Sequence, residues 1–121
     1  MGIKVSLGGL ASAVANCGGV GTISAAIRSD HLRDRKEIKE GDEADVSEFA
    51  SFIRDAKANT QGVVGVNIMC ALTSFTAMVN VAVREKADII FSGAGLPLTL
   101  PKLVEGSDIK IVPIVSSGRV T

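Results

Sequence analysis

The sequence contains no tryptophan, no tyrosine and a single histidine, and its two cysteines, Cys17 and Cys70, lack the spacing of a C-x-x-C pair. Both cysteines lie among apolar residues, so we expect two buried free thiols in preference to a disulfide or a metal site. Thirteen basic and thirteen acidic residues leave no net charge. This balance argues against a nucleic-acid or lipid-surface partner, because phosphate binding needs a basic excess.

Long hydrophobic runs are also missing. No apolar run approaches the length of about 20 residues that spans a bilayer, and no signal peptide is visible. We therefore expect a cytoplasmic chain without a membrane partner. The length of 121 residues, with 46% hydrophobic and 21% charged residues, is typical of one globular domain, which we expect to cover the whole chain from 1 to 121.

Segments with helical periodicity alternate with short apolar runs. The expected helices cover residues 10–17, 46–58, 74–86 and 99–104, and the expected strands cover 20–24, 63–69, 87–91 and 109–115. This alternation predicts right-handed β-α-β units, and therefore an α/β fold with a parallel sheet.

Apolar stripes mark the buried faces expected for three of the helices. The stripes are Leu10, Ala13, Val14 and Cys17; Val46, Phe49, Ala50 and Ile53; and Phe75, Met78, Val79, Ala82 and Val83. Asp45, followed by Glu48, resembles an N-terminal cap of the second helix. Thr99 is expected to cap the short last helix, with Pro101 in its first turn.

The segment 28–45 is dense in charges of both signs and contains the single histidine, His31. We expect a solvated loop or an exposed helical segment, with His31 as a surface histidine. The alternative is a lid over a substrate, because long loops that follow barrel strands often cover sites.

The strand 63–69 is almost wholly apolar, so we expect it to be buried on both faces of a parallel sheet. Its one polar side chain, Asn67, lies near its carboxyl end, where ligands bind in folds of this kind. Other strands end in small polar residues, at Ser24, at Ser92 and Gly93, and at Ser116 and Ser117, which leaves room for a flat polar ligand. The alternative for Asn67 is a cap for loop backbone groups.

Four segments together resemble a known family. They are GGLASAVANCGGVGTIS at 8–24, VGVNIM at 64–69, FSGAGLP at 91–97 and KIVPIVSS at 110–117. In order and spacing they are similar to the N-terminal half of nitronate monooxygenases, also called 2-nitropropane dioxygenases. The resemblance implies an FMN-dependent (β/α)8 barrel that oxidises alkyl nitronates with molecular oxygen, of which this chain would form about half.

The resemblance also implies a set of cofactor-binding residues. Asn67 would hydrogen bond the polar edge of the flavin ring, the backbone of Met1 and Gly2 would pass beside the ring, and Ser92 and Gly93 would line the pocket. The catalytic histidine of the family and its FMN phosphate loops would lie beyond Thr121. We therefore assign no catalytic residue and no metal ligand, and we expect the isolated chain to be inactive.

Two alternatives remain open. Flavin-dependent enoyl-acyl-carrier-protein reductases are similar to the same family and share the GVNIM and GAG segments, although SLGGL at 6–10 favours the monooxygenase. A non-catalytic alternative is a half-barrel that self-associates, because open sheet edges attract further strands. The expected partners are accordingly a small nitronate and oxygen, together with a homo-oligomer formed through the open edges.

Overall fold

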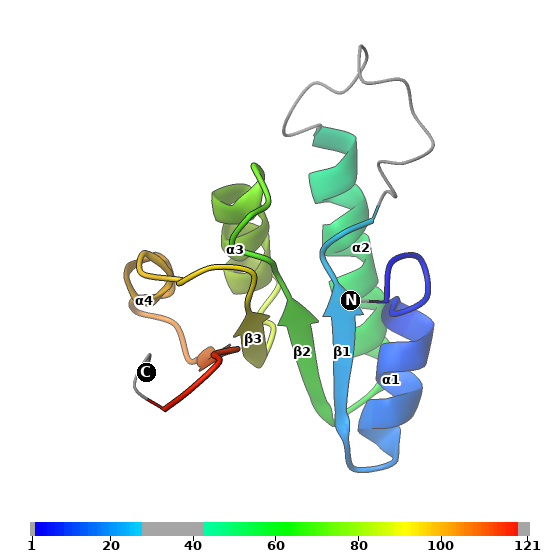
Figure 1. The fold of residues 1–121 in the computed structure, drawn as a ribbon. Helices are drawn as coiled ribbons and strands as arrows, with labels where there is room; N and C mark the ends of the chain where they lie inside the picture. Colours follow the sequence, from blue (N-terminus) through cyan, green and yellow to red (C-terminus); the bar gives the residue numbers. More distant parts are fainter. Residues whose placement is uncertain (1, 28–42, 119–121) are drawn as a thin grey trace.

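The computed structural model describes residues 2–27 and 43–118. The predictions for Met1, for His31 and for most of the charged segment lie outside these residues. Helices and strands alternate along the described chain (Figure 1). Their order is α1 (Gly8–Asn16), β1 (Val20–Ser24), α2 (Glu43–Asn59), β2 (Val63–Asn67), α3 (Phe75–Arg84), β3 (Ile89–Ser92), α4 (Leu100–Leu103) and β4 (Lys110–Pro113). The predicted α/β class is confirmed.

The four strands form one parallel sheet in the order β1-β2-β3-β4. Because parallel connections are right-handed, a sheet whose strands follow the chain order carries all of its helices on one face. Figure 1 shows this arrangement, with α1 and α4 at the two ends and α2 and α3 between them. A sheet wound in one direction only is part of a barrel rather than a doubly wound sheet. The structure therefore confirms the predicted portion of a TIM-type barrel.

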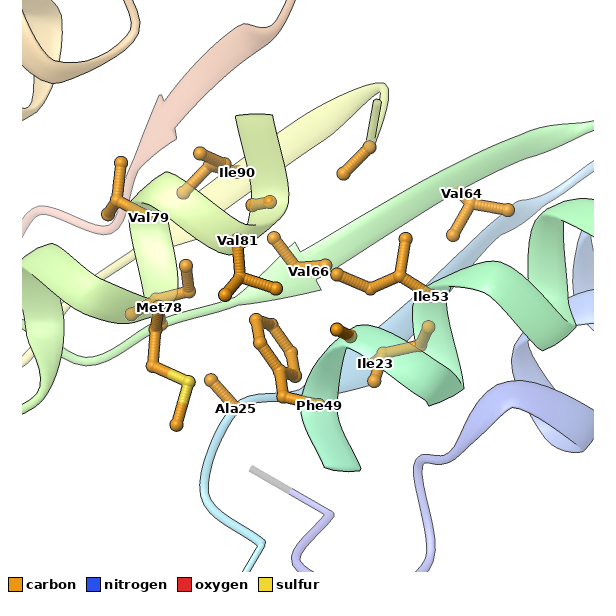
Figure 2. Packing of buried hydrophobic residues seen from close by; sticks show 14 of the residues in the cluster. Ile23, Ala25, Phe49, Ile53, Val64, Val66, Met78, Val79, Val81 and Ile90 are labelled. Carbon is orange, nitrogen blue, oxygen red and sulfur yellow. The ribbon is translucent and has the colours of Figure 1, made fainter. Parts of the chain in front are cut away.

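The hydrophobic core lies between the sheet and the helices. Residues that alternate along the strands point into it, so Ile23, Val66 and Ile90 are fully buried. Figure 2 shows the ring of Phe49, from α2, among Val66, Val81 of α3 and the other core residues. Burial of a side chain of this size contributes about 1.5–3 kcal/mol.

The predicted buried face of α1 is wrong. Leu10 and Val14 are 50% and 41% exposed, and Cys17 is exposed, whereas α1 buries Gly8, Ala11, Ser12 and Ala15. The reason is close approach: a Cβ added at Gly21 of β1 would overlap the backbone oxygen of Ala11. Only small side chains fit between a helix and a strand that lie this close, so the larger residues of α1 point outward.

The stripes predicted for α2 and α3 are confirmed, because Phe49, Ile53 and Val79 have no exposed surface. The start of α2 differs from the prediction. The helix begins at Glu43, so Asp45 lies within its first turn and is not the N-terminal cap. An acidic residue there still interacts favourably with the helix dipole.

The short helix α4 begins where it was predicted to begin, but without the expected capping hydrogen bond. Thr99 occupies the N-cap position, with Pro101 in the first turn as expected, but the Thr99 side chain makes no capping hydrogen bond.

None of the helices in the described part of the chain is long and apolar enough to cross a bilayer.

Among residues 2–27 and 43–118, no helix lies on the second face of the sheet, and the prediction that β2 is buried on both faces is wrong. Val64 and Val66 point to the helices and are fully buried, whereas Val63 is 40% exposed on the other face. We call this second face the bare face. In a closed barrel it is the face that lines the interior.

Both cysteines are free, as predicted, but neither is fully buried. Cys17 is exposed and Cys70 is half-buried, so the prediction of two buried thiols is wrong.

Ion pairs tie the helices to the amino ends of the strands. The Asp88 carboxylate accepts a hydrogen bond from the Val64 backbone N–H at 2.8 Å and pairs with Lys57 Nζ at 3.1 Å. Nearby, Arg54 of α2 donates two hydrogen bonds to Glu85, at 2.9 and 3.2 Å. These contacts fix α2 against the connection between α3 and β3.

Candidate functional site

Asn67 ends β2 at the carboxyl edge of the sheet and points to the bare face. The strand register places Ser24 of β1 on one side of it and Phe91 of β3 on the other. The Asn67 side chain is half-buried, and no residue in the described ranges hydrogen bonds to its amide. Its alternative role as a cap for loop backbone groups therefore finds no support within these ranges.

Phe91 lies beside Asn67 on the neighbouring strand, and the sequence did not predict it as a site residue. Its ring lies across Gly65 of β2, where an added Cβ would come within 2.9 Å of Phe91 Cε2. A glycine at position 65 thus leaves room for an aromatic ring next to the free amide. One feature of the sequence could have indicated Phe91 as a site residue: it is the one phenylalanine on a predicted strand.

Ser92 is fully buried, and its hydroxyl is engaged within the protein. Ser92 Oγ donates a hydrogen bond to the Ile68 carbonyl oxygen at 2.9 Å and lies 3.2 Å from Cys70 Sγ. These contacts join the end of β3 to residues 68 and 70, which follow Asn67 in the chain. The predicted cofactor contact of Ser92 stays a prediction, and the visible role of its hydroxyl is to hold the loops that follow the two strands.

Gly93 continues β3 on the bare face. Its carbonyl oxygen accepts a hydrogen bond from the Cys70 N–H at 2.8 Å, and an added Cβ would come within 3.1 Å of Ile114 Cβ. The next residue, Ala94, has a positive φ of 55°, which an alanine rarely adopts. The turn after β3 is thus tightly packed against its neighbours at the carboxyl edge of the sheet.

Gly2 lies in a turn that is fastened to the same edge. Its carbonyl oxygen accepts hydrogen bonds from the N–H groups of Val5 and Ser6, at 3.0 and 2.8 Å. The Ser6 carbonyl oxygen in turn accepts the N–H of Ser24, the last residue of β1, at 2.9 Å. The structure therefore brings Gly2, Asn67, Ser92 and Gly93 to one end of the sheet, and of these side chains Asn67 alone offers an unused polar group.

Two hollows lie elsewhere. One of about 850 Å³ sits at the opposite, amino end of the strands, between Lys57, Lys86 and Lys110. A smaller one of about 390 Å³ lies near the start of α1, between Leu7, Ile27 and neighbouring residues. Ligands of parallel β/α folds bind at the carboxyl ends of the strands, so we assign no ligand to the larger hollow. Within residues 2–27 and 43–118, no three His, Cys, Asp or Glu side chains gather as metal ligands.

No family model and no curated protein matches this chain. Its fold matches solved structures of FabK from Thermotoga maritima. One is 23% identical with a TM-score of 0.73 and covers 95% of this chain and 32% of FabK. A point mutant of the same protein is 23% identical with a TM-score of 0.75 and covers 99% of this chain and 36% of the other. The chain thus spans about a third of the FabK length, and at this identity the likeness establishes the fold alone.

Proposed function

We propose that this chain forms part of the flavin site of an FMN-dependent oxidoreductase, in which the Asn67 amide hydrogen bonds the polar edge of the flavin ring. The observation that carries the proposal is the free, half-buried Asn67 amide at the carboxyl end of β2. Ligands of β/α sheets bind at the carboxyl ends of the strands, so an amide that is free at this position fits a ligand contact.

The chemistry of the site residues suits this role. An amide both donates and accepts a hydrogen bond, as the alternating donors and acceptors of a flavin ring edge require. Phe91 offers an apolar surface beside the amide, and the engaged Ser92 hydroxyl stabilises the loops below it. FMN would supply the electron transfer when bound, because the protein contributes orientation and electrostatics to such reactions. The residues Gly2, Asn67, Ser92 and Gly93 bind and position, and none of them is suited to move a proton.

For the reaction, we favour oxidation of alkyl nitronates by molecular oxygen, since four segments of the sequence resemble nitronate monooxygenases. The fold likeness to FabK supports a β/α barrel of the same general kind. The second candidate is reduction of an enoyl thioester with a reduced nicotinamide, because the enoyl reductases share the GVNIM and GAG segments with the monooxygenases.

Titration of FMN with the purified chain tests the cofactor proposal. The chain contains no tryptophan and no tyrosine, the usual quenchers of bound flavin, so the anisotropy of the flavin fluorescence, which does not depend on quenching, reports binding. We expect Asn67→Ala to weaken binding by about fivefold, because a hydrogen bond to a ligand contributes on the order of 1 kcal/mol. The matched control is Asn80→Ala, which makes the same change at an exposed position of α3 and should leave the affinity unchanged. Equal affinities of all three proteins would contradict the role of Asn67.

Anaerobic reduction separates the two candidate reactions. If the flavin-loaded protein loses its visible absorbance on addition of propane-2-nitronate but not of a reduced nicotinamide, the nitronate reaction is supported. Bleaching by the nicotinamide alone would support the reductase and overturn the preferred reaction. Neither outcome alters the interpretation of the FMN titration.

A further inference from the structure

Cys70 lies where the segments that follow β2 and β3 meet. Its Sγ is 3.2 Å from Ser92 Oγ, and its backbone N–H donates a hydrogen bond to the Gly93 carbonyl oxygen at 2.8 Å. Asn67, which carries the proposed flavin contact, is three positions earlier in the chain. Cys70 therefore contacts two of the predicted site residues and closely follows a third.

The hydrogen bond between Cys70 and Ser92 has a defined direction. A serine hydroxyl carries one proton, and Ser92 Oγ donates this proton to the Ile68 carbonyl oxygen at 2.9 Å. The thiol of Cys70 must then be the donor to Ser92 Oγ. Because Ser92 has no exposed surface, solvent does not compete for its hydroxyl. The hydrogen bonds thus run from the thiol to the hydroxyl and on to the carbonyl group of Ile68.

The same contacts fix the backbone on both sides of the Asn67 peptide group. The Asn67 carbonyl oxygen accepts the Ala25 N–H at 3.0 Å, and the Ile68 N–H donates to the Phe91 carbonyl oxygen at 2.9 Å. The Ile68 carbonyl group is held in turn by the hydrogen bonds that start at Cys70. Within the described residues the Asn67 side chain has no hydrogen bond of its own, so its direction depends on this backbone.

The turn after β3 leaves little room around Cys70. A Cβ added at Gly95 would lie 3.1 Å from Cys70 Cβ, so this turn packs against the cysteine at a residue that has no side chain. Gly95 also has a φ of 139°, which residues with a side chain rarely adopt. A larger group on the Cys70 thiol would therefore displace the turn or the cysteine itself.

We propose that Cys70 is a positioning residue of the flavin site, whose thiol fixes the segment after Asn67 through Ser92 and so directs the Asn67 amide. The inference rests on the proposed function for its ligand, FMN, and deepens it by naming a group that controls the site. A substituent on the thiol removes the donor and crowds the turn at Gly95. Cys70 acts through Asn67 and is not itself a flavin contact.

Reversible blocking of the thiol tests the proposal on the complete chain. A thiol displaces methanesulfinate from methyl methanethiosulfonate to form a methyl disulfide, and dithiothreitol restores the thiol. Cys17→Ser retains only Cys70 as a target, and mass spectrometry establishes complete blocking. Blocking should weaken FMN binding by about fivefold, the effect expected for Asn67→Ala, and dithiothreitol should reverse the loss. Unchanged affinity after complete blocking would overturn the proposal.

Cys70→Ser is the matched control. It retains only Cys17, which is exposed and follows α1 at the opposite end of the sheet. Because a hydroxyl replaces the thiol as the donor to Ser92, the affinity of this variant for FMN should match that of the unmodified chain, and blocking should not change it. A loss of affinity on blocking Cys17 would overturn the assignment to Cys70.

A combined variant shows whether Cys70 acts through Asn67. In Cys17→Ser with Asn67→Ala, blocking should cause no further loss, because the effects of residues that act through one contact are not additive. A fivefold loss in this background as well, on the scale of one hydrogen bond, would overturn the positioning role.

A second measurement does not depend on FMN. In the isotope-labelled, FMN-free Cys17→Ser chain, blocking should move the side-chain NH₂ resonance of Asn67 and leave that of Asn80, an exposed residue of α3, in place. An unmoved Asn67 resonance would overturn the inference and leave the FMN proposal standing. Movement of both resonances would also overturn it, because Cys70 would then serve the stability of the whole chain. A chain that binds no FMN contradicts the proposed function, and the Asn67 resonance still tests the positioning by Cys70.

Discussion

The backbone oxygen of Ala11 occupies the space that a Cβ on Gly21 would fill. A second contact of the same kind lies one turn further along α1, where the Ala15 oxygen overlaps a Cβ added at Gly62. The two glycines set the distance between α1 and the amino ends of β1 and β2. They therefore determine which residues of α1 are buried and leave Leu10 and Val14 exposed.

Gly21→Ala should destabilise the protein by about 1–3 kcal/mol or more, because the new methyl group meets backbone atoms that cannot move aside. Gly9→Ala is the matched control. A Cβ at Gly9 meets no atom within 4 Å, and alanine is favoured over glycine in a helix by about 0.5–1 kcal/mol. Urea denaturation measures both variants, and equal midpoints for the two would contradict the close packing of α1.

Asp88→Ala should lower the free energy of unfolding by about 1–3 kcal/mol, because the Val64 N–H at the start of β2 loses its acceptor. Asp88→Asn keeps an acceptor oxygen and removes the ion pair with Lys57, which lies at the partly exposed surface. Its cost should be about 0–1 kcal/mol. Urea denaturation that ranks asparagine equal to alanine would show that the ion pair, and not the hydrogen bond to Val64, stabilises this corner.

The contribution of Glu85 to stability should depend on pH. Its hydrogen bond from Arg54, helped by Arg84, lowers the pKa of Glu85 below the ordinary value of 4.5, although burial opposes the shift. A lowered pKa in the folded state stabilises the protein above the pKa of the unfolded chain, and this stabilisation is lost as the pH falls through the folded value. Glu85→Gln should therefore be less stable than the unmodified chain at neutral pH, and the difference should vanish at acid pH. A difference in denaturation midpoint that does not change with pH would contradict this assignment.

Ser92→Ala should cost about 0.5–1.5 kcal/mol of stability, because the buried Ile68 carbonyl oxygen loses its donor. We expect the affinity for FMN to change less than in Asn67→Ala, since the Ser92 hydroxyl points into the protein. Thermal unfolding and the FMN titration measure the two effects. A large loss of affinity with unchanged stability would assign Ser92 to the cofactor contact that the sequence predicts.

The sequence predicted the elements whose signal comes from large apolar side chains. The stripes of α2 and α3 contain Phe49, Ile53 and Val79, and helical spacing was enough to identify their buried faces. For α1 the same rule selected Leu10 and Val14 and was wrong. The buried face there consists of small residues, which carry little hydrophobic signal, and it depends on how closely a distant strand approaches.

The sequence also predicted one part of the site, the position of Asn67, but not the contacts around it. Asn67 stands out as the one polar side chain at the end of an apolar strand, and the structure confirms its position at the carboxyl edge of the sheet. The contact between Ser92 and Cys70 joins residues 22 positions apart, and the position of Phe91 over Gly65 depends on the register of β2 and β3. Spacing along one segment carries no information on either contact.

A nuclear magnetic resonance titration of the isotope-labelled chain with FMN, followed at the side-chain NH₂ group of Asn67, tests directly whether the flavin binds at the end of β2. We expect this resonance to shift as FMN is added, together with the backbone signals of Phe91 and Gly93. An unmoved Asn67 amide, or shifts confined to Lys86 and Lys110 at the opposite end of the sheet, would contradict a flavin site at the end of β2.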